Sequence, residues 1–214
     1  MPYKFNFTKH KSHLTYKLLM PLVNTVIKAK YKTNYIGLEN IPAEGGFIIA
    51  ANHITALDPI IIAAGCKHPV HFMAKSELFK NKLVGAFLAG LNAFPVDRAT
   101  FGYESVNYAV EIVKSGDVLG IFPEGTRSPD FIPKKGKGGV CYIAKECRCD
   151  VVPVSLYTSD RAKNGTKLTV RYGKPIRYEA LQFDPDSKKM KDLRFAANLI
   201  MSEITKLWEA GHGN

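Results

Sequence analysis

The sequence predicts an α/β domain: a central, mostly parallel or mixed β-sheet flanked by helices, with a short amphipathic helix at its N-terminus. Two observations lead to this prediction. Apolar runs such as residues 47–51, 118–122 and 151–156 have the continuous hydrophobicity of strands that are buried on both faces. These runs alternate with segments that have the pattern of helices. The 214 residues contain no dividing linker, so we expect one globular domain.

The first expected element is a helix near the N-terminus, with an apolar face bordered by lysines. The residues that define it are Leu18, Leu19, Leu22, Val23, Val26 and Ile27, with Lys17, Lys28, Lys30 and Lys32 around them. Such a face is typical of a helix that lies in a membrane interface, although a surface helix packed on a protein core has the same pattern. We predict a basic amphipathic membrane-docking segment over residues 1–35. No run reaches the roughly 20 apolar residues of a membrane span.

The first strand-to-helix unit is expected between residues 47 and 65. The apolar run 47–51 ends at Asn52-His53, and Asp58-Pro59 then opens a second apolar stretch. Asp at the N-cap and Pro at the first helical position are a strong signal for the start of a helix. The sequence therefore predicts a buried strand, a short turn that contains His53, and a helix that Asp58 caps.

The remaining elements continue this alternation. We expect strands over 69–75, 93–96, 118–122 and 151–156, and helices over 103–115 and 139–146. Two further strands, 168–172 and 175–178, are expected to pair as a hairpin across Gly173-Lys174. The chain is expected to close with a helix whose apolar face carries Met190, Leu193, Ala197, Ile200, Ile204, Leu207 and Trp208.

The chain is strongly basic, with 30 Lys and Arg against 19 Asp and Glu and a net charge of +11. Such a charge attracts polyanions, which include nucleic acids, anionic lipid surfaces, phosphorylated substrates and acidic carriers. We predict no nucleic-acid partner, because the basic residues are scattered and no recognised binding motif is present. The four cysteines form no CxxC pair, which favours reduced thiols over a zinc site. We expect no metal and no bound cofactor.

His53 and Asp58 are the first candidates for catalysis. In a continuous helix their side chains would point about 140° apart, but the predicted turn lets the chain fold back and bring the carboxylate to the imidazole. A carboxylate that holds one ring nitrogen fixes the tautomer and makes the other nitrogen a better base. The alternative is that Asp58 only caps its helix and His53 is a hydrogen-bonded turn residue.

A second candidate site follows the strand at 118–122. Residues 122–128, Phe-Pro-Glu-Gly-Thr-Arg-Ser, lead through a loop rich in lysine and glycine to the helix expected at Gly139. The free N–H groups of a helix N-terminus favour phosphate, although a solvated basic loop has the same composition. Arg98, after the strand at 93–96, supplies a guanidinium for either a phosphate or a neighbouring carboxylate. The absence of a G-x-S-x-G motif favours direct attack by a substrate hydroxyl.

Four short motifs, in this order, resemble those of the glycerolipid acyltransferase family, in particular the bacterial 1-acylglycerol-3-phosphate acyltransferases. They are the H-x4-D box at His53–Asp58, the short strand that ends in arginine at Phe94–Arg98, F-P-E-G-T-R-S at Phe122–Ser128, and V-P-V at Val152–Val154. One departure is Ala93, near the position where the second box usually opens with glycine.

The resemblance implies an acyltransferase domain over residues 36–214. This domain would move a fatty-acyl group from acyl-CoA or acyl carrier protein to the sn-2 hydroxyl of lysophosphatidate, giving phosphatidate. His53 would act as general base in a direct transfer without an acyl-enzyme, and Asp58 would orient it. Glu124 is expected to bond a glycerol hydroxyl or to position Arg127. The implied substrate-binding residues are Lys75, Arg98, Glu124, Gly125, Thr126 and Arg127.

The resemblance also implies a location and the alternatives to this function. The enzyme would be peripheral or monotopic at the cytoplasmic face of the cell membrane, with the anionic phospholipid surface as a partner. Residues 83–91 would line an acyl channel, dip into lipid or form a buried helix. The alternative acceptors are another lysolipid or glycerol-3-phosphate. A non-catalytic lipid-binding protein is disfavoured, because the His53–Asp58 pair and the phosphate motif occur together.

Overall fold

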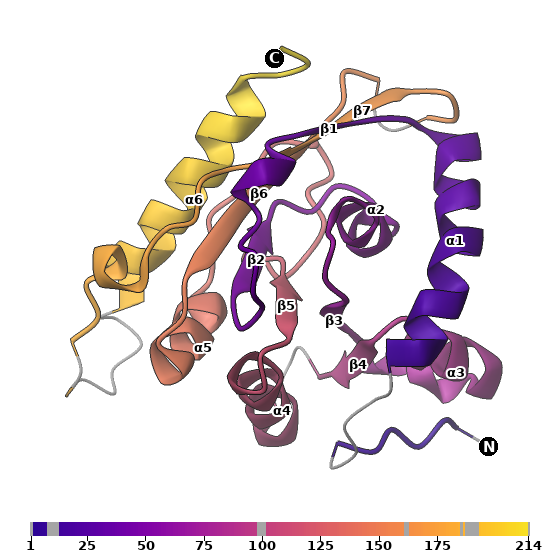
Figure 1. Cartoon of the computed structure of the whole chain (residues 1–214), viewed down its shortest axis with the longest axis horizontal. Helices are drawn as coiled ribbons and strands as arrows, with labels where there is room; N and C mark the ends of the chain where they lie inside the picture. Colours follow the sequence, from indigo (N-terminus) through magenta and orange to yellow (C-terminus); the bar gives the residue numbers. More distant parts are fainter. Residues whose placement is uncertain are drawn as a thin grey trace.

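The computed structural model describes residues 2–7, 13–97, 102–160, 163–184, 186 and 193–213. They form a seven-stranded sheet with helices on both faces (Figure 1). The strand order is β1-β7-β6-β2-β5-β3-β4. Every neighbouring pair is parallel except β6 and β7, which are antiparallel. The predicted α/β fold with a mixed sheet is therefore confirmed.

Apart from β1, which was not predicted, the strands occur where the sequence places its apolar runs. Their bounds are β1 Lys32–Ile36, β2 Ile48–Ala51, β3 Val70–Lys75, β4 Ala93–Val96, β5 Val118–Ile121, β6 Val151–Tyr157 and β7 Lys167–Tyr172. Every residue of β2 and β5 is buried, as expected for central strands that are covered on both faces. β2 lies between β5 and β6 and runs parallel to both, so the carboxyl ends of these three strands meet at one edge of the sheet.

The helices cover the sheet in two layers. Their bounds are α1 His13–Lys30, α2 Asp58–Gly65, α3 Lys82–Gly90, α4 Tyr103–Lys114, α5 Gly139–Cys147 and α6 Arg194–Glu209, with short 3-10 turns at Leu38–Asn40, Ser76–Lys80 and Tyr178–Leu181. Alternate residues of β2 face the two layers. Ile49 and Ala51 pack with α1 and α2, whereas Ile48 and Ala50 pack with α4, α5 and α6.

The predicted N-terminal helix is present, but it packs on the core and is followed almost directly by a strand of the sheet. α1 buries a row of side chains in the core and leaves a second row exposed. The buried row is Tyr16, Met20, Val23 and Ile27, and the exposed row is Leu14, Leu18, Leu22 and Val26. The predicted boundary between residues 35 and 36 falls inside β1, which pairs with β7. No helix in the described residues is long and apolar enough to cross a membrane.

The hairpin predicted across Gly173-Lys174 is wrong. β7 pairs with β6 and β1, and residues 175–178 contribute only one isolated bridge, between Ile176 and Val151. The Gly173 N–H donates to the carbonyl of Pro153, so the chain after β7 is held against β6 and does not fold back on β7. Of the closing helix, α6 is confirmed, while Met190 lies outside the described residues.

Candidate active site

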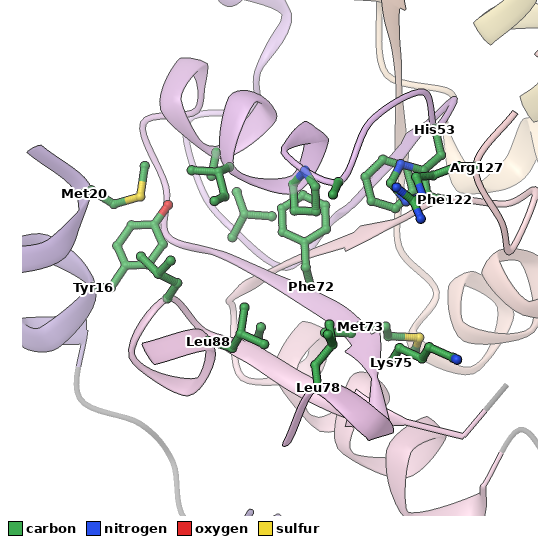
Figure 2. Close-up of a pocket in the computed structure, with 18 residues that line it drawn as sticks. Tyr16, Met20, His53, Phe72, Met73, Lys75, Leu78, Leu88, Phe122 and Arg127 are labelled. Carbon is green, nitrogen blue, oxygen red and sulfur yellow. The ribbon is translucent and has the colours of Figure 1, made fainter. Parts of the chain in front are cut away.

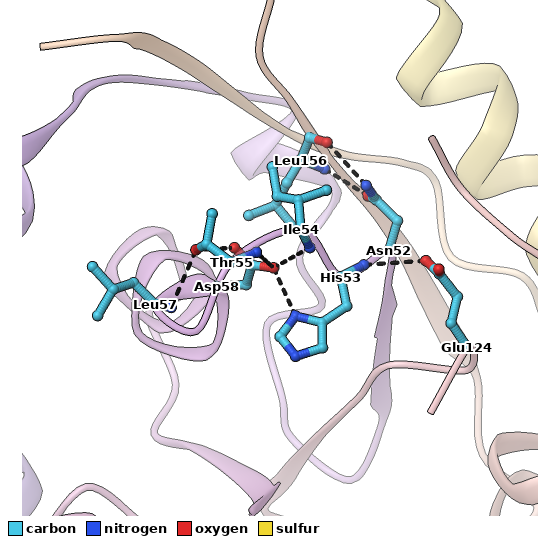
Figure 3. Close-up of polar contacts among 8 residues, drawn as sticks. All are labelled: Asn52, His53, Ile54, Thr55, Leu57, Asp58, Glu124 and Leu156. Carbon is cyan, nitrogen blue, oxygen red and sulfur yellow. Dashed lines mark hydrogen bonds and ion pairs between the residues drawn. The ribbon is translucent and has the colours of Figure 1, made fainter. Parts of the chain in front are cut away.

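The site begins at the carboxyl end of β2, where Asn52 and His53 follow the last residue of the strand. The Asn52 side chain donates to the Leu156 carbonyl at 3.0 Å and accepts from the Leu156 N–H at 2.8 Å. This fully buried amide therefore extends the β2–β6 pairing by one step. The chain is fixed up to the position from which His53 leaves the sheet (Figure 3).

His53 and Asp58 are in contact, as the turn between strand and helix predicted. The Asp58 carboxylate lies 2.7 Å from His53 Nδ1 (Figure 3). The same carboxylate accepts from the N–H groups of Ile54 and Thr55 at 2.6 and 2.8 Å, and from the Thr55 hydroxyl at 2.7 Å. With Asp58 as the acceptor at Nδ1, the His53 Nε2 atom keeps its lone pair and can act as a base.

The start of α2 differs by one residue from the prediction. Leu57 is the N-cap and makes no side-chain capping bond, while Asp58 is the first helical residue and Pro59 the second. Asp58 does not cap its own helix, because its carboxylate is turned back toward the β2–α2 turn and the imidazole. The alternative in which Asp58 is only a helix cap is therefore excluded by these contacts.

Residues 122–128 contact both the backbone and the ring of His53. Glu124 Oε1 accepts from the His53 N–H at 3.1 Å, and the Ser128 N–H donates to the His53 carbonyl at 2.8 Å. The imidazole stacks on the Phe122 ring, with ring centroids 4.0 Å apart. Both backbone groups and the ring face of His53 are thus fixed by one loop, which limits the imidazole to a small range of orientations.

Glu124 makes a contact that we did not predict. It is buried, and its Oε1 accepts a hydrogen bond from the His53 N–H; within the part of the chain that the structure describes, it makes no bond to Arg127. Burial raises the pKa of the Glu124 carboxyl to about 7, and the hydrogen bond from the His53 backbone opposes this shift only in part. Glu124 is therefore a titratable group whose carboxylate holds the backbone of His53, the candidate base.

An apolar pocket of about 300 Å³ opens on one side of His53 (Figure 2). Arg127 lies beside His53 at one end of this pocket, and Lys75 lies near Met73 and Leu78 (Figure 2). At the other end it reaches Tyr16 and Met20 of α1 (Figure 2). Its walls between these ends include Ala56, Pro59, Ile60, Ala63, Val70, Phe72, Leu88, Leu91 and Phe122. A pocket with apolar walls and a cation at one end suits a long hydrocarbon chain with a polar head.

A smaller pocket of about 80 Å³ also reaches His53, and it shares Met73 and Phe122 with the larger one. It is lined by Gly125, Lys137 and Gly139, together with residues of β5. Gly139 opens α5, so the free N–H groups of a helix N-terminus lie beside a lysine. Gly125 has a φ of 73°, and a side chain here would come within 3.2 Å of Lys137 Nζ, so glycine keeps this space open.

The predicted substrate residues do not all contact these pockets. Lys75 and Arg127 line the apolar pocket and Gly125 lines the smaller one, whereas Thr126 is exposed and lines neither. Lys75 also pairs with Glu77 at 3.0 Å. Arg98 lies outside the described residues.

Sequence reasoning missed two features of the site. Lys137 belonged to the predicted basic loop, but its approach to the small pocket depends on how that loop folds. The second is the contribution of α1 to the apolar pocket. The spacing of Tyr16 and Met20 marks them as inward-facing, although it does not indicate that they face a cavity rather than solid core.

Comparison with known proteins identifies the family. Residues 32–157 match the family described as Acyltransferase. The chain belongs to this acyltransferase family. It is 30% identical over 193 residues to the 1-acyl-sn-glycerol-3-phosphate acyltransferase of Bacillus subtilis, covering 88% of this chain and 96% of that protein. A protein of the same name from Streptococcus pneumoniae is 31% identical over 185 residues, covering 82% of this chain and 66% of that one.

A solved structure of another such protein agrees with the fold of this acyltransferase. The crystal structure of the 1-acyl-sn-glycerophosphate acyltransferase PlsC from Thermotoga maritima matches with a TM-score of 0.66 and 22% identity. The match covers 94% of this chain and 85% of that one. At this identity the match supports the architecture. The assignment to the acyltransferase family depends on the family match and on the sequence relatives.

Proposed function

We propose that this acyltransferase moves a fatty-acyl group from a thioester to the sn-2 hydroxyl of lysophosphatidate, giving phosphatidate. The observation that carries this proposal is the position of His53 between an apolar pocket and a small cationic pocket. Such a site accepts a substrate that is apolar at one end and anionic at the other. The bacterial relatives named 1-acyl-sn-glycerol-3-phosphate acyltransferase support lysophosphatidate as the acceptor.

His53 is the general base in this proposal. Its Nε2 takes the proton of the acceptor hydroxyl as the oxygen attacks the thioester carbonyl, and Asp58 stabilises the imidazolium through Nδ1. The tetrahedral intermediate then collapses, the carbon–sulfur bond breaks, and the thiolate of CoA or of the carrier protein takes the proton from His53. The new ester bond is formed directly, with no acyl-enzyme. Acyl-CoA and acyl carrier protein both fit this chemistry, and we predict no further cofactor.

The two pockets divide the binding of the substrates. The apolar pocket holds a fatty-acyl chain, which gains roughly 0.8 kcal/mol for each buried methylene group. Arg127 and Lys75, which line this pocket, and Lys137 with the start of α5, in the smaller pocket, attract the phosphate of the acceptor. Gly125 keeps the small pocket open, and Arg98 and Thr126 remain candidate phosphate contacts from the family resemblance.

The exposed face of α1 supports docking on an anionic membrane surface. Leu14, Leu18, Leu22 and Val26 form a row whose members are 56–70% exposed, and Lys17 and Lys28 lie on the same helix. α3, which contacts α1, exposes Leu83 and Phe87 as well. An apolar row with lysines beside it is typical of a helix in the headgroup region. We propose that these two helices hold the enzyme at the cytoplasmic face of the membrane as a peripheral or monotopic protein.

The test is lysophosphatidate-dependent thiol release by the full chain in anionic vesicles. Palmitoyl-CoA and the palmitoyl thioester of acyl carrier protein serve as donors, and wild type is compared with His53→Ala and His68→Ala. His68 is a half-buried histidine that contacts the Pro42 carbonyl and lines neither pocket, so it is the matched control. We expect release by wild type and His68→Ala, and a loss of roughly 10²- to 10⁴-fold in His53→Ala.

The acceptor is tested in the same assay. Glycerol-3-phosphate and lysophosphatidylcholine replace lysophosphatidate at equal concentration, and the faster donor identifies the carrier of the acyl group. Faster release with either replacement would move the assignment to that acceptor. No release with any acceptor from folded wild type would overturn the proposed function.

A further inference from the structure

A second cluster of histidine and aspartate lies far from His53 in the fold. His13 opens α1, His71 belongs to β3, and Asp117 immediately precedes β5, which is the neighbour of β3. Their candidate ligand atoms, one from each residue, all lie within 4.8 Å of one another. β2 and β5 are parallel, and His53 follows the carboxyl end of β2 while Asp117 precedes the amino end of β5. The cluster is therefore at the opposite edge of the sheet from His53.

We propose that His13, His71 and Asp117 form a site for a divalent transition-metal ion, with Zn²⁺ as the best match. Two imidazole nitrogens and one carboxylate oxygen are a donor set that zinc uses, with a water molecule or the second carboxylate oxygen in the fourth position. The proposal departs from the sequence analysis, which predicted no metal. It is also independent of the proposed acyl transfer.

The distances in the cluster carry the proposal. His13 Nε2 lies 3.2 Å from Asp117 Oδ1, and His71 Nε2 lies 3.3 Å from Asp117 Oδ2. The His53–Asp58 pair in the same molecule, which is a direct hydrogen bond, measures 2.7 Å. Ligand atoms at about 2.0–2.1 Å from a tetrahedral zinc ion are separated from one another by about 3.3 Å. The separations at Asp117 match that spacing better than the length of a charge-assisted hydrogen bond.

The cluster is also held in place by its surroundings. Asp117 is fixed at both backbone groups, because its N–H donates to Ile112 and its carbonyl accepts from Gly46. The side chain of His71 is 4% exposed, so its ring is confined by the sheet. The side chain of His13 is 35% exposed and leaves a path for an ion from solvent. A bound ion would join the first turn of α1 to β3 and β5.

Cobalt binding tests this site in the full-length protein after chelation and dialysis. Co²⁺ is added to wild type, His13→Ala and the matched control His68→Ala while visible and near-ultraviolet absorption is recorded. We expect one Co²⁺ per chain in wild type and His68→Ala, with d–d absorption and no sulfur-to-metal charge transfer. His13→Ala should bind at least about tenfold more weakly.

Zn²⁺ is then followed by thermal unfolding, with Asp117→Asn as a second variant that keeps the side-chain shape. Zn²⁺ should raise the Tm of wild type and leave the Tm of both cluster variants unchanged. Absence of saturable Co²⁺ binding in wild type would overturn the proposal, because a purely hydrogen-bonded cluster predicts that result. Thiolate charge transfer, or equal binding by folded His13→Ala and Asp117→Asn, would place the ion elsewhere, for example at the cysteines, and would overturn it too.

Discussion

The two pockets beside His53 are built from different parts of the chain. The larger one is lined by side chains from helices and strands that are distant in sequence, from Tyr16 in α1 to Phe122 after β5. The smaller one is lined largely by two short stretches that are close in sequence, within residues 120–125 and 137–140, together with His53, Met73 and Val96. Hydrocarbon binding needs many apolar walls, whereas anion binding needs a few N–H groups and one or two cations.

This difference predicts different responses of the two pockets. Binding in the apolar pocket should depend on acyl-chain length and little on salt, since burial of hydrocarbon scales with its area. Binding in the small pocket should weaken with ionic strength, because exposed charges are screened over about 8–10 Å at physiological salt. Substitutions that affect one pocket, both pockets or neither should therefore separate the roles of these regions.

Asp58→Asn should give the largest effect, because it acts on the imidazole that both pockets share. The amide cannot stabilise the imidazolium, and we expect kcat to fall by roughly 10²- to 10⁴-fold with little change in either KM. Steady-state kinetics measure this loss. Thr55→Val is the control, since it removes the hydroxyl bond to Asp58 Oδ1 and the acceptor of the Leu57 N–H but leaves the contact between Asp58 and His53. A folded Asp58→Asn enzyme with more than a tenth of wild-type kcat would contradict the role of Asp58.

Lys137→Met should affect the small pocket alone. Loss of one charged contact to the acceptor phosphate should raise the KM for lysophosphatidate by about tenfold and leave the KM for the thioester unchanged. The rise in KM with added salt should also be shallower than in wild type. Lys135→Met, an exposed lysine of the same loop that lines neither pocket, is the matched control. Equal effects of the two substitutions would show that only the overall charge of the loop matters.

Met20→Trp should affect the apolar pocket alone. The larger side chain shortens the end formed by α1, and each methylene that no longer fits should lower kcat/KM by about fourfold. The measurement uses thioesters and then lysophosphatidates of graded chain length, which also shows whose chain occupies the pocket. Leu18→Trp, on the exposed face of the same helix, should leave the profile unchanged. An unchanged profile in both variants would place the acyl chain elsewhere.

Glu124→Gln should give the smallest effect on activity, and its signature is in the pH dependence of stability. The folded-state pKa of Glu124 is raised from 4.5 to about 7, so the folded protein holds this proton more tightly than the unfolded chain. Glu124 therefore favours folding most below pH 4.5, and this contribution is lost as the pH rises toward about 7. Glutamine keeps an acceptor for the His53 N–H and does not titrate.

Thermal unfolding of both proteins from pH 4.5 to 8 measures this difference. The Tm of wild type should fall relative to that of Glu124→Gln across the window and run parallel to it above the pKa of Glu124. Glu124→Ala leaves the His53 N–H without its acceptor and should be less stable than either, by about 1–3 kcal/mol. Parallel curves for wild type and Glu124→Gln at every pH would show that Glu124 keeps one protonation state.

The local chemistry of the site could be predicted from the sequence, because it depends on residues that are close together in the chain. The run 47–51 and the Asp58-Pro59 step place His53 in a turn, and the turn is what allows the contact with Asp58. The larger pocket could not be predicted in this way. Its walls come from residues up to about half the chain apart, and helical periodicity does not distinguish a side chain that faces a cavity from one in solid core.

The strand predictions failed where pairing is decided over long distances. β1 begins with Lys32-Thr33-Asn34 and lacks an apolar run, but its parallel pairing with β7 makes it a strand at the edge of the sheet. The predicted hairpin at Gly173-Lys174 has turn residues between two apolar segments. β7 instead finds its antiparallel partner in β6, a choice that depends on the whole sheet.

The two rows of α1 give this helix two separable sets of positions on which selection can act. Tyr16 and Met20 face the pocket, whereas Leu18 and Leu22, two residues further along in each case, face outward. Substitutions in the outer row can adapt the helix to a membrane of different lipid composition without altering which fatty acids the enzyme accepts. Substitutions in the inner row can change that preference while the outer surface stays the same. Membrane docking and fatty-acid preference can thus evolve independently, although both depend on the same helix.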